Sequence, residues 1–84
     1  MAWYLYLIEC EGGSIYTGVT TNVEVRYAAH ASGKGARYTR SHPPVRLLMS
    51  LAFENRSSAQ KAEYRIKQLS ASEKRAYCKQ HATC

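Results

Sequence analysis

The sequence has no long apolar run, no C-x-x-C pair of cysteines and no aspartate. Its most apolar stretch, WYLYLI near the start, is much shorter than the roughly 20 residues of a membrane span. That stretch also lacks the basic leader and the small-residue cleavage site of a secretory signal. We therefore expect a soluble, cytoplasmic protein without a membrane partner.

The cysteines do not form a disulfide framework, because Cys10, Cys78 and Cys84 are an odd set without paired spacing. This usage fits a reducing compartment. Cys78, His81 and Cys84 have spacings found in zinc sites, but a fourth ligand is not evident and the segment is a chain end. We expect unpaired thiols on a fraying helix there.

Acidic side chains are scarce, with six Glu against 12 Lys and Arg and a formal net charge of +6. Segment 25–53 contains no acidic residue, and tyrosines and histidines are interleaved with its basic ones. This mixture favours nucleic-acid contact over a merely solvated basic surface. A chain of 84 residues has room for one domain, 1–84, and one site. The basic residues of the segment are Arg26, Lys34, Arg37, Arg40 and Arg46.

The first elements should be two antiparallel strands, over residues 3–10 and 14–20, joined by a glycine turn. A three-residue loop over 11–13 would place Tyr6 and Tyr16 on one face of the hairpin, whereas a two-residue loop would separate them. We predict the three-residue parity.

A helix should follow, capped by Thr21 or Asn22, with Glu24 placed to complete a capping box from Thr21. It should run to about Ser32, with Arg26 and His30 one turn apart on one face. Residues 33–44 are predicted as a long, mobile, basic loop.

The third strand, residues 46–54, is almost continuously apolar, which predicts a central position buried on both faces. Ser57 with Gln60 should open a second helix, and Ser70 with Glu73 a third, over about 71–82. The order ββαβαα predicts an α+β fold, a three-stranded antiparallel sheet flanked by helices. The apolar stripe of the second helix is Ala59, Ala62, Ile66 and Leu69.

The polar residues of these elements have plain explanations when each is taken alone. Strand tyrosines are usually packing residues, and an Arg/His pair on a helix is usually surface polarity. Glu63 can form an ordinary helix ion pair with Lys67. Together, however, they form a pattern of phenols, a guanidinium, an imidazole and a lone carboxylate.

That pattern resembles the GIY-YIG nuclease family over about residues 3–70. Its first motif corresponds to Tyr4-Leu5-Tyr6, its second to Tyr16-Thr17-Gly18, and its helix signature to Arg26-x-x-x-His30. The segment AEYRIKQL, 62–69, resembles the family's acidic helix, with Glu63 as the glutamate. The chain is similar to the small, stand-alone bacterial members of the family. It departs from the family in having no asparagine after Glu63.

The resemblance implies a metal-dependent DNA endonuclease that hydrolyses phosphodiester bonds. Glu63 would be the ligand of one Mg²⁺ or Mn²⁺, since such ions keep several waters and take oxygens from phosphate. Arg26 would hold a phosphate oxygen. Tyr6 would be the general base, with Tyr16 close by. His30 is the alternative base, because a phenol of pKa about 10 needs its anion stabilised.

The remaining candidate residues lie around this set. Gly18, inside a strand pattern, should leave room beside Tyr16 for a phosphate or a helix. By the resemblance, the loop after His30 borders the site. Its candidate nucleic-acid-binding residues are Lys34, Arg37, Tyr38 and Arg40.

Two other functions remain open: a nucleic-acid-binding module that does not cut, and a subunit of a DNA repair complex. Single-stranded or branched DNA is the favoured substrate, because no accessory part is evident to grip duplex grooves. The choice between DNA and RNA and the pathway, repair or recombination, stay open. No organic cofactor is expected, and a monomer is expected, with a dimer as the alternative.

Overall fold

The computed structural model describes residues 2–81. It has the predicted α+β fold and the ββαβαα order, with one additional short helix. The elements are β1 (Trp3–Cys10), β2 (Ile15–Thr20), α1 (Val23–Ala31), α2 (Arg37–Ser41), β3 (Pro44–Phe53), α3 (Arg56–Lys67) and α4 (Ala71–His81).

The hairpin of β1 and β2 has the predicted three-residue loop, Glu11–Gly13. The backbone N–H of Cys10 donates to the carbonyl of Ser14 (2.8 Å), and Ile8 pairs with Tyr16. The side chains of Tyr6 and Tyr16 therefore lie on the same face of the sheet, as predicted.

The sheet order is β2-β1-β3, so β1 is the central strand and β3 is an edge strand. The prediction that the third strand is central was wrong. Its apolar run is not buried on both faces, since Leu47 and Ala52 stay exposed. The strand buried on both faces is β1, whose residues Leu5–Ile8 are all buried.

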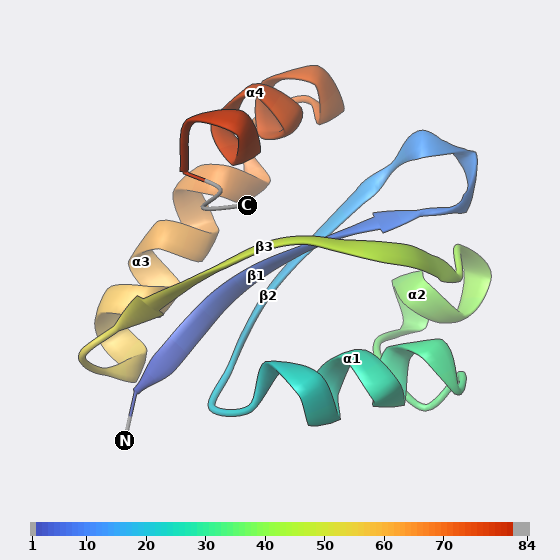
Figure 1. The fold of residues 1–84 in the computed structure, drawn as a ribbon, viewed down its shortest axis with the longest axis horizontal. Helices are drawn as coiled ribbons and strands as arrows, with labels where there is room; N and C mark the ends of the chain where they lie inside the picture. The colour runs from blue at the N-terminus through green and yellow to red at the C-terminus, as the bar shows by residue number, and fades with distance from the viewer. Residues whose placement is uncertain (1, 82–84) are drawn as a thin grey trace.

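Helices cover the two faces of the sheet differently: α3 and α4 lie on one side, and α1 and α2 lie on the other (Figure 1). Leu5 and Leu7 point towards α3 and α4, in a core that includes Ile66. Tyr6 and Ile8 point to the opposite face, towards α1. The strand alternation of β1 thus separates a hydrophobic core from a more polar one. The predicted stripe of α3 is confirmed, because Ala59, Ala62, Ile66 and Leu69 are buried or packed on the core.

Asparagines cap two of the helices. Asn22 Oδ1 accepts from the backbone N–H of Val25 (3.1 Å), and Asn55 Oδ1 accepts from that of Ser58 (2.9 Å). Asn22 was one of the two predicted caps of α1, but the capping box from Thr21 to Glu24 was wrong.

The cap predicted for α3, Ser57 with Gln60, was also wrong, because Asn55 opens that helix two residues earlier. The third capping prediction is confirmed. Ser70 and Glu73 form a reciprocal capping box, with distances of 2.9 and 3.1 Å.

The segment predicted as a long loop, 33–44, contains helix α2. Its buried residue is Thr39, whose hydroxyl donates to the carbonyl of Ala36 (2.9 Å). A short helix without an apolar stripe shows no hydrophobic periodicity in the sequence. Only the turn residues and the basic charge of this segment can therefore be recognised from the sequence.

Polar contacts fasten α4 to the hairpin. Arg75 donates to the Glu9 carboxylate (2.9 Å) and to the Gly13 carbonyl (2.7 Å), and Lys74 donates to the Ile15 carbonyl (3.1 Å). Cys78 is a free thiol in the core, and burial raises its pKa.

The zinc spacing noted in the sequence includes Cys84, which lies outside the described residues. Within residues 2–81, no helix is both long enough and apolar enough to cross a membrane.

Candidate active site

The centre of the candidate site is a buried pair, Tyr6 and His30. Tyr6 lies on the central strand β1, and His30 lies in the last turn of α1; each has only 1% of its surface exposed. The Tyr6 hydroxyl and His30 Nε2 are 3.0 Å apart, a hydrogen-bonding distance. The face shared by β1 and α1 therefore brings together two residues that are 24 positions apart.

A third residue fixes the direction of this hydrogen bond. His30 Nδ1 lies 2.6 Å from the hydroxyl oxygen of Thr39. The single hydrogen of that hydroxyl is donated to the Ala36 carbonyl, so the oxygen accepts from Nδ1–H. Neutral His30 then has an unprotonated Nε2, which accepts the hydrogen of the Tyr6 hydroxyl. Tyr6, His30, Thr39 and Ala36 form one directed chain.

Two glycines make room for this chain. A Cβ on Gly18 would lie 2.5 Å from the Tyr6 hydroxyl oxygen, and a Cβ on Gly35 would clash with His30 Nδ1 and lie 2.8 Å from the His30 Cα. Gly18 was predicted to leave space for a phosphate or a helix, but the phenol of Tyr6 fills that space. Gly35 was not predicted.

Tyr16 completes an aromatic cluster around the pair. Its ring centroid lies 6.2 Å from that of Tyr6 and 4.9 Å from that of His30. The hairpin parity puts the two phenols on one face, and α1 brings the imidazole against both.

Burial and nearby charge determine the protonation of the pair. Burial, with a contribution from Tyr16, raises the pKa of Tyr6 to about 12; the Arg26 guanidinium acts in the opposite direction, and Glu63 raises the pKa further. Burial and Arg26 lower the pKa of His30. Tyr6 and His30 are therefore both neutral at neutral pH. The charges of Arg26 and Glu63 both act on the Tyr6 hydroxyl.

Glu63 also forms the ion pair that its i,i+4 spacing to Lys67 suggested. Its carboxylate lies 3.3 Å from Lys67 Nζ, and a fifth of its side-chain surface is exposed. Helix α3 packs on the face of the sheet opposite to α1. The carboxylate and the imidazole thus come from different layers.

Among the described residues, no three His, Cys or Glu side chains form a ready-made metal cage. Glu63 is the carboxylate that acts on Tyr6. A lone carboxylate fits a hard divalent ion that keeps most of its waters and takes further oxygens from a bound phosphate. The donor set therefore fits the predicted Mg²⁺ or Mn²⁺.

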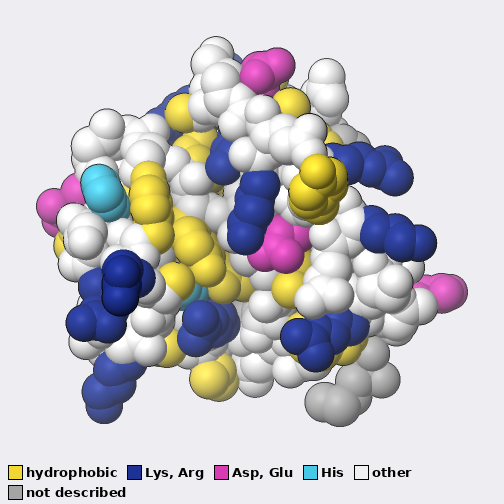
Figure 2. All heavy atoms as spheres, turned by 180° about the vertical axis from the view of Figure 1, so that it is seen from behind, with side chains coloured by type: hydrophobic (Ala, Val, Ile, Leu, Met, Phe, Trp, Pro, Cys, Tyr) yellow, Lys and Arg dark blue, Asp and Glu magenta, His cyan; other side chains and the backbone are white. Residues whose placement is uncertain are grey.

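The residues predicted to bind nucleic acid follow α1 and lie on or just before α2. Lys34, Arg37 and Arg40 are exposed, and Tyr38 is 39% exposed with its ring stacked on that of Tyr16. Figure 2 shows one face of the molecule, where Lys and Arg side chains lie around a band of hydrophobic ones. The exposed cations and the partly exposed ring of Tyr38 offer both positive charge and an aromatic surface.

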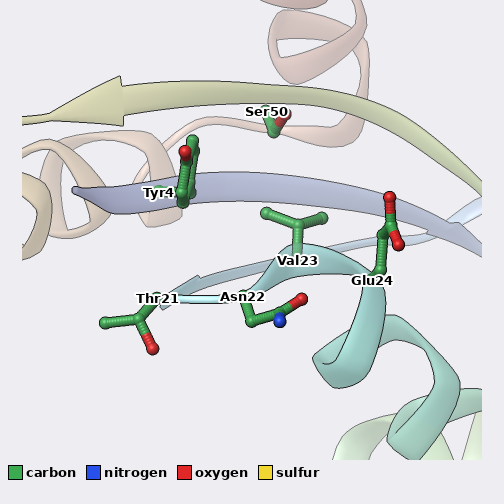
Figure 3. Close-up of a pocket in the computed structure, with 6 residues that line it drawn as sticks. All are labelled: Tyr4, Thr21, Asn22, Val23, Glu24 and Ser50. Carbon is green, nitrogen blue, oxygen red and sulfur yellow. The ribbon is translucent and has the colours of Figure 1, made fainter. Parts of the chain in front are cut away.

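A separate hollow opens at the start of α1 (Figure 3). Figure 3 shows the Glu24 carboxylate at the edge of this hollow, pointing towards the sheet. A carboxylate at this position disfavours a phosphate there, so we do not place the phosphate site in this hollow. It is lined by Tyr4, Thr21, Asn22, Val23, Glu24 and Ser50.

Sequence reasoning missed three residues near the site: Gly35, Thr39 and His42. His42 stacks on Tyr38, four residues earlier, which is a helical spacing that a predicted α2 would have revealed. Thr39 had no signal of its own, because its role depends on the tertiary position of His30.

Comparisons with known proteins identify the family of this chain. The model of the GIY-YIG catalytic domain matches residues 2–76. A UPF0213 protein of Cupriavidus necator is 61% identical over 94% of this chain and 86% of its own length. A UPF0213 protein of Streptococcus agalactiae is 47% identical over 93% of this chain and 89% of its own length.

A solution structure of the UPF0213 protein BH0048 from Bacillus halodurans is similar as well. It has a TM-score of 0.62 and 43% identity, over 99% of this chain and 88% of that one. The solution structure of the protein EF2693 from E. faecalis has a TM-score of 0.65 and 40% identity, over 95% and 85%. The catalytic-domain model matches nearly the whole of this chain, which shows that the chain belongs to the GIY-YIG family.

Proposed function

We propose that this protein is a divalent-metal-dependent DNA endonuclease that hydrolyses phosphodiester bonds. The observation that carries the proposal is the buried Tyr6–His30 hydrogen bond, on which Arg26 and Glu63 both act electrostatically. Simple nucleic-acid binding has no need of a buried, directed proton path beside a cation and a carboxylate.

Tyr6 and His30 act in series in this proposal. The hydroxyl hydrogen of Tyr6 points to His30 Nε2, so in this proposal a lone pair of the phenolic oxygen accepts the proton of an attacking water. As the water gives its proton to Tyr6, Tyr6 passes its own to His30. The two candidate bases of the sequence thus become one relay, and Thr39 holds the imidazolium through Nδ1–H.

Arg26 and Glu63 deal with the phosphate. Arg26 donates to a non-bridging oxygen, which neutralises charge as the phosphorus becomes pentavalent. Glu63 would hold the metal ion, which would supply positive charge to the phosphate when bound. Lys34, Arg37 and Arg40 hold the strand through its phosphates, with Tyr38 beside them.

A cleavage panel tests the proposal. Single-stranded, duplex and flap DNA and RNA are incubated with the protein, with and without Mg²⁺ or Mn²⁺, beside Tyr6→Phe, His30→Ala and Glu63→Ala. We expect metal-dependent cleavage that each substitution reduces by about 10²-fold or more. No cleavage of any substrate, or unchanged cleavage by Glu63→Ala, would contradict the proposal.

The finer features of the substrate and assembly are also proposals. We propose single-stranded or branched DNA as the substrate, cut by a monomer that consists of one domain over residues 1–84 and uses no organic cofactor. One site cuts one strand, so complete cleavage of a duplex requires a dimer or two encounters. Gel filtration with light scattering, alongside the panel, checks the monomer.

The second candidate is a nucleic-acid-binding module that does not cut. The ion pair between Glu63 and Lys67 favours it, because the pair gives the glutamate an ordinary role on α3. The same panel separates the two functions, since this candidate predicts binding without cleavage. A subunit of a repair complex would cut only after its partner is added.

A further inference from the structure

A ladder of aromatic rings leads from the candidate site to the surface. The Tyr16 ring lies 4.9 Å from His30 at the buried end. Tyr38 stacks on Tyr16 at 6.1 Å with an interplanar angle of 25°, and His42 stacks on Tyr38 at 4.6 Å and 16°. The planes of the outer rings are therefore nearly parallel, as in a stack of bases.

Core packing does not explain the outer rings. Thr39 is the buried residue of α2 and anchors that helix through His30 and Ala36. Tyr38 is 39% exposed, and His42, at the end of α2, is exposed as well. The exposed rings remain in water, where a flat apolar ligand would gain by covering them.

The charges beside the ladder identify the ligand. Arg37 and Arg40 are exposed on α2, and Lys34 is exposed just before it. Segment 25–53 has no acidic residue to compete for these cations. Stacked aromatic rings next to phosphate-binding cations are the usual means by which proteins hold single-stranded nucleic acid.

We propose that Tyr16, Tyr38 and His42 form a stacking platform for one nucleobase of the substrate, which lies against the outer, exposed face of His42 at the end of the ladder. A base can stack there only when it is not paired and stacked in a duplex. The substrate class is therefore a strand with an unpaired base beside the phosphate that is cut. This inference rests on the proposed function and adds His42 and the stacking role to it.

The test is a binding measurement that does not depend on cleavage. The probe is a short single-stranded DNA with 2-aminopurine, whose fluorescence is quenched by stacking, in a Glu63→Gln background without metal ion. We expect His42→Ala and Tyr38→Leu each to weaken binding by about fivefold or more and to reduce the quenching. Tyr38→Phe, which keeps the ring, should bind like the parent.

A strand with abasic nucleotides in place of bases is the matched control. Arg37→Ala should weaken binding of the normal and abasic strands equally, because it contacts phosphate. His42→Ala and Tyr38→Leu should weaken only the normal strand. Equal binding of both strands by the parent, or unchanged quenching in His42→Ala and Tyr38→Leu, would overturn the platform.

The platform and the nuclease can fail separately. Ring-dependent binding without cleavage in the panel would contradict the nuclease and keep the platform. Metal-dependent cleavage with unchanged binding by His42→Ala and Tyr38→Leu would keep the nuclease and contradict the platform. Circular dichroism of each variant shows that it is folded, and Tyr38→Phe tests the ring with the least change in packing.

Discussion

Thr39 supplies one hydroxyl to the site, and that hydroxyl determines which nitrogen of His30 carries the hydrogen. A hydroxyl that donates to the Ala36 carbonyl can only accept from Nδ1–H. Nε2 is then left to accept from Tyr6, which orients the phenol for the role proposed above. In that proposal Thr39 acts through His30.

Replacement of Thr39 separates this positioning role from packing. Thr39→Val keeps the shape but removes the hydroxyl, and we expect kcat to fall roughly 10- to 100-fold with little change in KM. Thr39→Ser should retain most of the activity. Nitrogen-15 NMR of the His30 ring should show the Nδ1–H tautomer in the parent and in Thr39→Ser, and a shift towards Nε2–H in Thr39→Val. An unchanged tautomer in Thr39→Val would contradict the role.

Gly18 is crowded by side-chain atoms, whereas Gly35 is crowded by both the side chain and the backbone of His30, and double variants should reveal the difference. Gly18→Ala meets the end of the Tyr6 side chain, whereas Gly35→Ala meets His30 Nδ1 most closely and also the His30 Cα. We expect each alanine to lower the free energy of unfolding by about 1–3 kcal/mol, as overpacking does. Tyr6→Ala should relieve most of the loss in Gly18→Ala, but His30→Ala should relieve only part of the loss in Gly35→Ala, because the backbone contact remains.

Urea unfolding of the single and double variants measures both couplings. Additive losses in the pair Gly18→Ala and Tyr6→Ala would show that the phenol is not what fills the space at Gly18. Full relief of Gly35→Ala by His30→Ala would show that the backbone contact is unimportant.

At the scale of single residues, the sequence allowed the motif residues to be chosen but not their connections. Tyr6, Tyr16, Arg26, His30 and Glu63 could be selected from spacing and resemblance. The hydrogen bond between Tyr6 and His30 depends on how α1 packs on β1, and the link to Thr39 depends on α2. Such contacts are properties of tertiary structure, so local patterns do not contain them.

At the scale of elements, the helix caps offer a sharp test, because each observed cap lies close to another residue that the sequence suggested as the cap. Asn55→Ala and Asn22→Ala should each lower the free energy of unfolding by about 1 kcal/mol. The exposed neighbours Ser57→Ala and Thr21→Ala should change it much less. Urea unfolding measures all four. A larger loss for Ser57→Ala than for Asn55→Ala would contradict the cap assignment.

Some elements with a strong local signal were predictable, although two of the three predicted capping boxes do not form, and elements placed by tertiary packing were not predictable. The hairpin loop and the Ser70–Glu73 box follow from short-range chemistry, and both are confirmed. The apolar run of β3 suggested burial on both faces, but the sheet has only three strands and β1 takes its centre. Sheet order depends on how strands pair across the chain, and the run itself holds no information about that pairing.

At the scale of the whole molecule, the buried imidazole makes stability depend on pH. Burial and Arg26 lower the pKa of His30 in the folded state, whereas in the unfolded chain it is about 6.5. Below that value the unfolded chain binds the proton more readily, so protonation favours unfolding. The contribution of His30 is complete above about pH 6.5 and decreases as the pH falls towards its folded pKa.

Urea unfolding from about pH 7.5 down to about pH 5 should therefore show stability falling with pH, and the fall should be smaller in His30→Asn. Arg75 and Arg46 lower the pKa of Glu9, so its contribution is lost in a more acidic range and does not overlap. An identical pH dependence in the parent and in His30→Asn would contradict the assignment.

The position of β1 has a consequence for the order in which parts of this molecule open. Its amide hydrogens are bonded in alternation to β2 on one side and to β3 on the other. They should therefore exchange with solvent only when the whole domain unfolds. Helix α2 has five residues and little buried surface, so it should open in smaller and more frequent fluctuations. On warming, α2 and the strand-binding residues proposed on it should therefore loosen first, while the phenol of Tyr6 stays in place until the final cooperative transition.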